Sequence, residues 1–204
     1  MKEKEFEKYI QQDSWFHGTT LINWKRICAS GVRADYNKGL ESDFGYGFYL
    51  TPKYEQAKSY ITRMLPYLHS DEKDKVPVVI EFELNLAKLI DEEFSYAKFL
   101  NFDESFAKFV ANCRLHPQVR IHNYDFVVGV MSDSNPLKLI DDYRRDLISM
   151  DDVLAGLLKG NSMQQLCLHN QSICDTLIVK KVYNLIEEKE EDANDYNKRF
   201  FWKS

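Results

Sequence analysis

Residues 43–51 read DFGYGFYLT, the most informative stretch of the sequence. Gly45 and Gly47 flank a tyrosine, and paired glycines favour a tight bend or a close backbone approach, which neither a core strand nor a helix needs. The run over residues 47–51 predicts a short strand, and the proline after it fits the first turn of a helix over residues 53–61. We therefore expect a loop, a strand and a helix here, with another group close to the loop backbone.

On both sides of this stretch, short apolar runs alternate with helical patterns. The sequence predicts a strand over residues 14–19 and a helix over residues 21–29 that ends at Gly31. Apolar and charged residues alternate over residues 76–86, which is the period of a half-buried strand. The other expected elements are mostly helix over residues 85–115, a buried strand over 124–131, two helices within 137–158, and strands over 165–169 and 178–185. The pattern indicates a mixed α+β fold and lacks the regular strand–helix alternation of a Rossmann fold.

The composition indicates one globular domain. Of 204 residues, 44% are hydrophobic and 14% aromatic, so the chain can bury a real core and is not disordered. Its formal net charge of -5 argues weakly against sequence-independent binding to nucleic acid. We expect a charged helix within residues 1–13, the main domain over 14–187, and an acidic and aromatic tail over 188–204. A solvated helix is the default for this tail, and its aromatic end is expected to dock on the domain or on a partner.

The sequence contains no signal for membrane insertion, for secretion or for a metal. The longest apolar run, residues 126–131, is strand-sized, and the N-terminal residues lack the apolar core of a secretion signal. The four cysteines contain no C-x-x-C pair, and His69, His116 and His122 have no metal-like spacing. We therefore expect a cytoplasmic protein with reduced cysteines, no membrane partner and no metal site.

Three segments interrupt an apolar strand with a polar or aromatic residue at a defined place: FHGT at residues 16–19, DFGYGFYLT at 43–51 and QLCLH at 165–169. Each has an ordinary explanation when taken alone. A His-Gly pair at the end of a strand is more often a turn than a site, and a tyrosine in a strand is usually a core residue. Asp43 and Asp125 favour cap or turn roles over functional ones by about two to one.

The order and spacing of the three segments resemble the ADP-ribosyltransferase superfamily, on the branch that includes diphtheria toxin and the poly-ADP-ribose polymerases. That branch carries His-Gly-Ser/Thr on one strand, Gly-x-Gly-x-Tyr later, and a glutamate on a third strand. In the polymerases a second tyrosine follows the first by eleven positions, and Tyr49 and Tyr60 keep that interval. The sequence looks closest to an uncharacterised, toxin-like bacterial family with Asp-Phe-Gly-x-Gly-Phe-Tyr-x-Thr and a later Tyr-Asp strand, here Tyr124-Asp125. The resemblance covers residues 14–187.

This resemblance implies an ADP-ribosyltransferase-like split β-sandwich with flanking helices, and an NAD-dependent mono-ADP-ribosyltransferase activity. It assigns NAD binding to His17, Gly18, Thr19, Gly47, Tyr49 and Tyr60, and catalysis to Gln165, His17 and Tyr49. Two tyrosine faces suit the flat nicotinamide ring, which is cationic when glycosylated. The backbone of Gly18 can offer the carboxamide one donor and one acceptor, and in the family the equivalent of His17 hydrogen-bonds a ribose hydroxyl.

Two positions depart from the family pattern. Gln165 stands where the polymerases carry glutamate, and a glutamine can hydrogen-bond a ribose hydroxyl but cannot act as a base, which argues against chain elongation. Ala57 replaces a serine that contacts nicotinamide, which weakens the expected binding, with Thr51 or Ser59 as compensating residues. If the leucines of the third segment face the core, alternation places Gln165 and His169 on the cleft face.

Stand-alone domains of this kind are often toxins of toxin–antitoxin or phage-defence systems. By analogy, the expected partners are an unidentified macromolecular acceptor and a small antitoxin protein. Arg33 and Lys38 are candidates for the NAD pyrophosphate or for plain solvent contact. Two other functions fit the same residues: an NAD glycohydrolase, in which water replaces the acceptor, and a non-catalytic domain that binds NAD, ADP-ribose or a partner.

Overall fold

The computed structural model describes residues 3–68, 75–132, 136–191 and 193–201. The elements in chain order are α1 (Glu3–Ile10), β1 (Ser14–Thr20), α2 (Leu21–Ser30), β2 (Phe48–Leu50), α3 (Tyr54–Met64), the 3-10 helix η1 (Leu65–Tyr67), β3 (Pro77–Glu83), α4 (Leu86–Asp91), β4 (Tyr96–Phe99), α5 (Glu104–Leu115), β5 (Phe126–Ser132), α6 (Pro136–Arg144), α7 (Met150–Leu157), β6 (Gly160–Leu168), α8 (Gln171–Cys174), β7 (Ile178–Asn184), β8 (Lys189–Glu191) and α9 (Asn194–Phe201).

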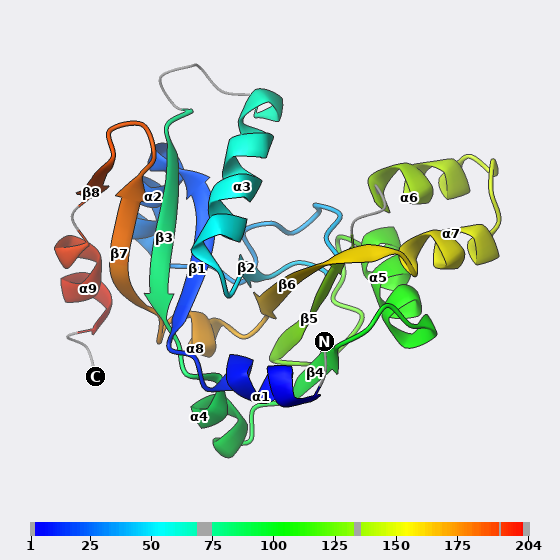
Figure 1. The fold of residues 1–204 in the computed structure, drawn as a ribbon, viewed down its shortest axis with the longest axis horizontal. Coiled ribbons are helices and arrows are strands. Elements are labelled where there is room, and N and C mark those ends of the chain that lie inside the picture. The colour runs from blue at the N-terminus through cyan, green and yellow to red at the C-terminus, as the bar shows by residue number, and fades with distance from the viewer. Residues whose placement is uncertain (1–2, 69–74, 133–135, 192, 202–204) are drawn as a thin grey trace.

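The strands form two four-stranded sheets, whose strands run in different directions in Figure 1. The first sheet has the order β1-β3-β7-β8 and is antiparallel throughout. The second has the order β2-β6-β5-β4, in which β4 and β5 are parallel and the other pairs antiparallel. This is the mixed α+β architecture predicted from the sequence.

One bridge joins the two sheets at the edges of β1 and β2. Phe16 and Thr51 exchange two backbone hydrogen bonds, each with an N–O distance of 2.8 Å. Beyond this bridge the two edges diverge, since β1 belongs to one sheet and β2 to the other. The divergence leaves an opening between the strands that carry His17 and Tyr49.

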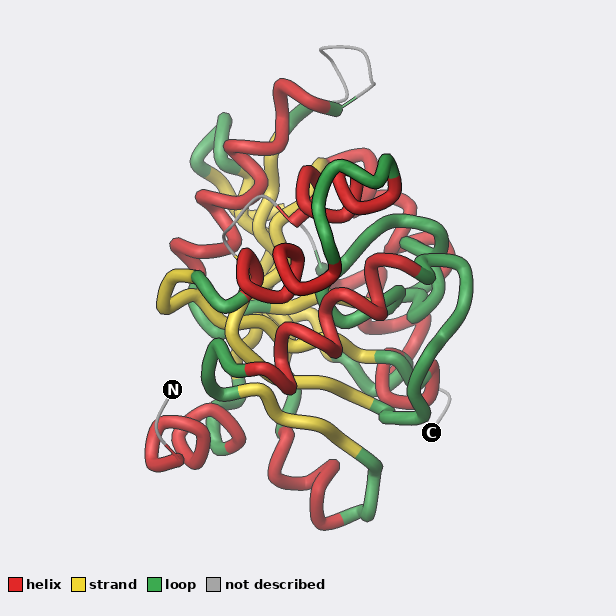
Figure 2. Tube along the Cα trace, turned by 90° about the vertical axis from the view of Figure 1, so that its right-hand side faces the viewer, coloured by secondary structure: helices red, strands yellow, loops and turns green. Residues whose placement is uncertain are grey.

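Two apolar cores follow from the alternation of side chains along the strands. One lies between the two sheets and includes Phe82, Leu166 and Leu168, all fully buried. The other lies between the second sheet and the helices α5, α6 and α7, and it includes Phe44 and Cys167. Figure 2, which looks at this side of the molecule, shows helices in front of the strands. The leucines of the third segment therefore face the first core and Cys167 faces the opposite way, as predicted.

Most predicted elements are present, and two segments differ. α2 ends at Gly31, whose φ of 78° is accessible to glycine, as expected. Residues 85–115 are mostly helical, as predicted, but they also contain β4, which was not predicted and which lies between α4 and α5 and pairs with β5. The acidic tail is not only a solvated helix, because β8 pairs with β7 at the edge of the first sheet. Both strands are short and depend on a partner strand for stability, β4 on β5 and β8 on β7.

Both ends of the described chain pack on the main domain. Phe6 of α1 is 4% exposed within the first core, and Tyr196 of α9 lies with its ring centroid 5.9 Å from that of Trp24. Asn197 also exchanges hydrogen bonds with the backbone of Val179. The side chains of residues 200–204, on which the expected docking of the tail's aromatics rests, lie outside those described. No helix within the described ranges is long and apolar enough to cross a membrane.

Candidate active site

A cavity of about 590 Å³ opens where the two sheets meet, and Phe16 and Thr51 are among the residues that line it. Its volume is in the usual range for small-molecule sites. All seven residues that the sequence suggested line this cavity: His17, Gly18 and Thr19 of β1, Gly47, Tyr49 of β2, Tyr60 of α3 and Gln165 of β6. The fold thus brings three distant segments to one place.

His17 is a neutral ring with a fixed orientation. Its Nδ1 lies 2.8 Å from the carbonyl oxygen of Tyr49, and because a carbonyl only accepts, Nδ1 carries the proton. The imidazole also packs on Phe48, with ring centroids 4.6 Å apart. Burial lowers the pKa of His17, so the ring is uncharged at neutral pH. Its Nε2 is consequently an acceptor for a hydroxyl or an N–H group.

The backbone of Gly18 points into the opening between the sheets. Residues of an antiparallel strand direct their N–H and C=O groups alternately to one neighbour and to the other. Phe16 directs both groups to Thr51, away from β3, so Gly18, two residues later, points the same way. β2 has already diverged at this level, since the Phe16–Thr51 pair is the one bridge between the two sheets in the part of the chain that the structure describes. A donor and an acceptor therefore lie side by side at the cavity.

Gly18 also lets α3 approach β1 closely. A Cβ atom at this position would lie 2.2 Å from the carbonyl oxygen of Ala57 and 3.2 Å from Cβ of Ile61. Ala57, which stands where the resemblance to the polymerases would expect a serine, is 1% exposed and lies in this contact. The hydroxyl oxygen of Thr51, one of the two predicted compensating residues, is buried beside the cavity and has no hydrogen-bond partner among the described residues. Ser59 lines the cavity as well.

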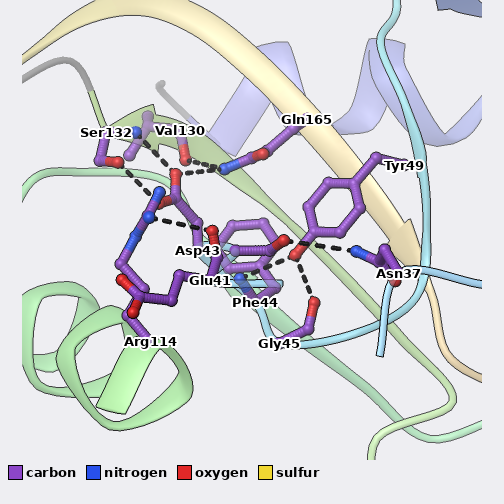
Figure 3. Close-up of polar contacts among 11 residues, drawn as sticks. Asn37, Glu41, Asp43, Phe44, Gly45, Tyr49, Arg114, Val130, Ser132 and Gln165 are labelled. Atoms are coloured by element: carbon purple, nitrogen blue, oxygen red, sulfur yellow. Dashed lines mark hydrogen bonds and ion pairs between the residues drawn. The ribbon is translucent and has the colours of Figure 1, made fainter. Parts of the chain in front are cut away.

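Tyr49 closes the preceding loop onto its own strand. Its hydroxyl donates to the carbonyl of Gly45 at 2.7 Å and accepts from the amide of Phe44 at 3.0 Å (Figure 3). Burial raises the pKa of Tyr49 well above its usual value, so the hydroxyl stays protonated. With the hydroxyl occupied in this way, the part of the Tyr49 side chain that remains for a ligand at the cavity is its ring.

Glycine is required at positions 45 and 47 of the loop for two different structural reasons. Gly45 has a φ of 80°, a conformation that side chains disfavour. At Gly47 a Cβ atom would lie 2.3 Å from Sγ of Cys167 and 2.8 Å from the carbonyl of Leu168. The group expected close to this backbone is therefore β6, and the amide of Gly47 donates to the side chain of Asn37 at 2.7 Å.

Asp43 lies at the centre of a buried polar network that the sequence did not predict (Figure 3). Its Oδ1 accepts from Nε of Arg114 at 2.9 Å, from Nη2 of Arg114 at 2.5 Å and from the hydroxyl of Ser132 at 2.6 Å. Its Oδ2 accepts from the amide of Ser132 at 3.0 Å and from Nε2 of Gln165 at 2.8 Å. The expected cap or turn role of Asp43 was wrong, because its partners are 71 to 122 positions away in sequence.

Gln165 lines the cavity and is 7% exposed. Besides the bond to Asp43, its Nε2 donates to the carbonyl of Val130 at 3.3 Å, so both amide hydrogens are used inside the protein. Its Oε1 has no hydrogen-bond partner in the part of the chain that is described. Gln165 therefore offers the cavity a neutral acceptor.

The cavity mouth combines apolar and basic side chains. Tyr60 of α3 is 45% exposed, and Tyr36, Leu40 and Leu137 are more exposed than that while also lining the cavity. Arg26 and Arg63 lie on the two flanking helices and line it as well. A partly apolar, partly basic mouth suits contact with a second molecule.

A second cavity of about 770 Å³ adjoins the first, since Ser30 and Arg33 line both. His169 lines this second cavity and not the first. The prediction that His169 shares the cleft face with Gln165 was therefore wrong. Nδ1 of His169 lies 2.8 Å from the carbonyl of Tyr46, and burial lowers the pKa of this histidine to about 3. Arg120 lies over the Tyr46 ring, 4.9 Å from its centroid.

Three weaker candidates have structural roles. Asp125 accepts hydrogen bonds from Ser95 and Asn170, which lie 30 and 45 positions away. It therefore links the start of β5 to the starts of β4 and α8, and the expected cap or turn role was wrong. Lys38 lies over Tyr46 at 5.7 Å, and Arg33 pairs with Asp35.

No group of three metal-binding side chains occurs within the described ranges, and no two of the four cysteines, all of which lie in those ranges, form a disulfide. His69 lies outside those ranges. His122 contacts the carbonyl of Phe44 through its Nε2 at 3.3 Å.

Comparison with known proteins gives one match. Residues 16–178 match a family model described as "Protein of unknown function (DUF3990)". This range contains all three segments that line the first cavity. Neither the curated proteins nor the solved structures gave a match.

Proposed function

The chain belongs to this DUF3990 family of proteins of unknown function, and we propose that it is an NAD-dependent mono-ADP-ribosyltransferase with an ADP-ribosyltransferase-like split β-sandwich. The observation that carries the proposal is the open edge of β1 at Gly18. The backbone donor and acceptor of Gly18 have no partner on that side among the described residues, and Tyr49 and Tyr60 line the same cavity. A carboxamide on an aromatic ring requires this combination.

Each predicted residue has a role in this proposal. Gly18 holds the nicotinamide carboxamide, and the ring lies between Tyr49 and Tyr60. Thr51, whose buried hydroxyl lacks a partner among the described residues, takes the place of the missing serine. Thr19 and Gly47 shape the wall. His17 accepts a ribose hydroxyl at its Nε2.

Catalysis requires stabilisation of positive charge on the ribose as the bond to nicotinamide breaks. Tyr49 keeps the leaving ring in place through its face. Gln165 accepts a hydrogen bond from a ribose hydroxyl through Oε1 and orients the sugar. Because a glutamine cannot take a proton, the proposal is transfer of one ADP-ribose unit and excludes chain elongation.

The size and form of the site support a dinucleotide. NAD is elongated, and the two cavities adjoin at Ser30 and Arg33. Arg33, which pairs with Asp35 and lines both cavities, would meet the pyrophosphate, whereas Lys38 lies over the ring of Tyr46. The apolar and basic mouth is available to a macromolecular acceptor.

By analogy with stand-alone domains of this kind, we expect a cytoplasmic toxin of a toxin–antitoxin or phage-defence system, neutralised by a small antitoxin protein. A second candidate function, a non-catalytic domain that binds NAD or ADP-ribose, is favoured by one observation, the neutral amide at Gln165 in place of a carboxylate.

The test follows free nicotinamide and labelled ADP-ribose when the purified protein is incubated with labelled NAD and a cell lysate. Tyr60→Ala is the informative variant, since Tyr60 lines the cavity and is 45% exposed, so the fold tolerates its loss. Tyr67→Ala is the matched control, because Tyr67 is 71% exposed and lies outside the cavity lining.

Release of nicotinamide with transfer of label, lost in Tyr60→Ala and kept in Tyr67→Ala, is the expected result. Release without transfer would replace the transferase with an NAD glycohydrolase. NAD binding without release would leave the non-catalytic domain, and absence of binding would reject the site.

A further inference from the structure

We propose that Asp43 is a positioning residue that fixes Gln165 as an acceptor and makes glutamine, not glutamate, the residue that fits at position 165. This inference rests on the proposed function for its catalytic consequence, but the contact that carries it does not. The two side chains come from different elements, the loop before β2 and the strand β6.

The carboxylate of Asp43 has a complete set of donors. Five hydrogen bonds reach its two oxygens, and Arg114 compensates its charge. Both members of this ion pair are less than a tenth exposed. A second layer holds Arg114, whose Nη1 donates to the carbonyl of Glu41 at 3.1 Å. Asp43 is therefore held in place independently of Gln165.

This fixed carboxylate decides which way the Gln165 amide points. In the observed orientation Nε2 meets Asp43 Oδ2 and the carbonyl of Val130, both of which only accept. A flipped amide would place Oε1 against these two acceptors and would lose both hydrogen bonds. The buried network thus leaves Oε1 as the group presented to a ligand, which must bring a hydroxyl or an N–H.

The same contact explains the departure from the family's glutamate. A glutamate at position 165 would place a second carboxylate at the 2.8 Å contact with Asp43. Two carboxylates this close cannot both ionise without a strong penalty. A change at position 165 therefore requires a compensating change at position 43.

The first experiment measures thermal unfolding midpoints at pH 7.5 and needs no ligand. Gln165→Glu and Asp43→Asn are each expected to lower the midpoint by about 10 °C, the first by carboxylate repulsion and the second by leaving Arg114 without its partner. In the double variant Asp43→Asn/Gln165→Glu, the new carboxylate is next to the asparagine amide and the arginine, so the fall is smaller than for either single change.

The matched control is Gln164→Glu. Gln164 is the adjacent residue, is 9% exposed against 7% for Gln165, and faces away from Asp43. Asp43→Asn should not rescue Gln164→Glu, and the decreases in unfolding midpoint caused by these two changes should add. Additive decreases for Asp43→Asn and Gln165→Glu would overturn the proposed contact. So would a rescue of Gln164→Glu by Asp43→Asn that is as large as the rescue of Gln165→Glu.

The second experiment measures kcat and KM for nicotinamide release. Asp43→Asn and Gln165→Met are each expected to lower kcat about tenfold or more while KM changes less than about threefold. Because Asp43 acts through the Gln165 amide, Asp43→Asn should lower kcat no further in the Gln165→Met background. An undiminished loss in that background would show a general structural role and overturn the positioning role.

Failure of the proposed function gives a different result from failure of this inference. A wild-type protein that neither binds nor cleaves NAD would reject the function, and the thermal cycle would still decide whether Asp43 orients Gln165. Active wild-type protein with an additive thermal cycle would reject the inference alone.

Discussion

The cavity has two walls that are built in different ways. The sheet wall, defined as residues 43–47 with Tyr49 and Gln165, has its polar groups bonded to one another and to Arg114. The helix wall, defined as α3, meets β1 at Gly18 and presents Tyr60, which is 45% exposed. The groups of the sheet wall are thus fixed before any ligand arrives and would orient it under the proposed function, while the more exposed helix wall would add stacking area that can adjust.

Loss of the buried ion pair should destabilise the sheet wall more than any other change considered below. Arg114→Met leaves Asp43 buried without its charge partner, and the free energy of unfolding should fall by about 3–5 kcal/mol. The control is Arg145→Met, because the ion pair of Arg145 with Asp141 is exposed, and it should change stability by less than about 1 kcal/mol. Urea unfolding measures both. Equal losses of stability in the two variants would mean that the buried Arg114–Asp43 pair stabilises the protein no more than an exposed ion pair does.

The next effect tests the base of the helix wall. Gly18→Ala places a Cβ atom 2.2 Å from the carbonyl of Ala57, so α3 must shift, at a cost of about 1–3 kcal/mol. The shift also moves Tyr60, and NAD affinity should weaken. Urea unfolding and calorimetric titration with NAD measure the two effects. Unchanged stability would show that α3 adjusts along its whole length.

The stability of the loop over residues 43–47 should depend on pH through His169, which donates a hydrogen bond to the carbonyl of Tyr46. Its pKa falls from 6.5 to about 3 on folding, so the unfolded chain takes up the proton first as the pH drops. The contribution of His169 to the free energy of unfolding is present in full above its unfolded pKa of 6.5 and declines as the pH falls below that value. The decline amounts to about 1.4 kcal/mol between pH 7.5 and 5.5.

The control for this pH effect is the exposed His116. Urea unfolding at both pH values should give a smaller acid loss for His169→Asn than for the wild type, and an unchanged loss for His116→Asn. An acid loss that His169→Asn leaves intact would assign it to other groups. Burial also lowers the pKa values of His17 and His122, which adds to the loss in the same direction.

The smallest effect compares the two tyrosines directly. Tyr49→Phe removes a hydroxyl that holds Phe44 and Gly45, and should cost about 1 kcal/mol. Tyr60→Phe should change the free energy of unfolding by less than about 0.5 kcal/mol, since the Tyr60 side chain is partly exposed. Differential scanning calorimetry measures both, and a larger loss for Tyr60→Phe would reverse the assignment of the walls.

The sequence predicted the elements whose signals are local. β1, α2 and β3 appear where strand alternation, the glycine stop and the apolar face indicated them. β4 was missed because four residues between two helices carry no period, and its parallel pairing with β5 is a long-range contact. β8 was hidden for a similar reason, since three charged residues form a strand at the edge of the sheet.

At the candidate site, the sequence predicted the lining residues and missed what holds them. His17, Tyr49 and Gln165 carry a spacing that a family pattern makes visible, whereas Asp43 and Arg114 are 71 positions apart and share no local motif. One signal was available: Arg114 lies in a run of apolar helical residues, and a buried arginine requires an acceptor. Nothing in the sequence identified which carboxylate supplies it.

The contact between Asp43 and Gln165 has an evolutionary consequence. Because glutamate at position 165 is incompatible with a carboxylate at position 43, neither position can change alone without loss of stability. Lineages that exchange the neutral amide for an acid should first pass through a neutral residue at position 43, or change both in one step. An alignment of relatives should therefore show the two positions varying together, with at most one acid in each pair.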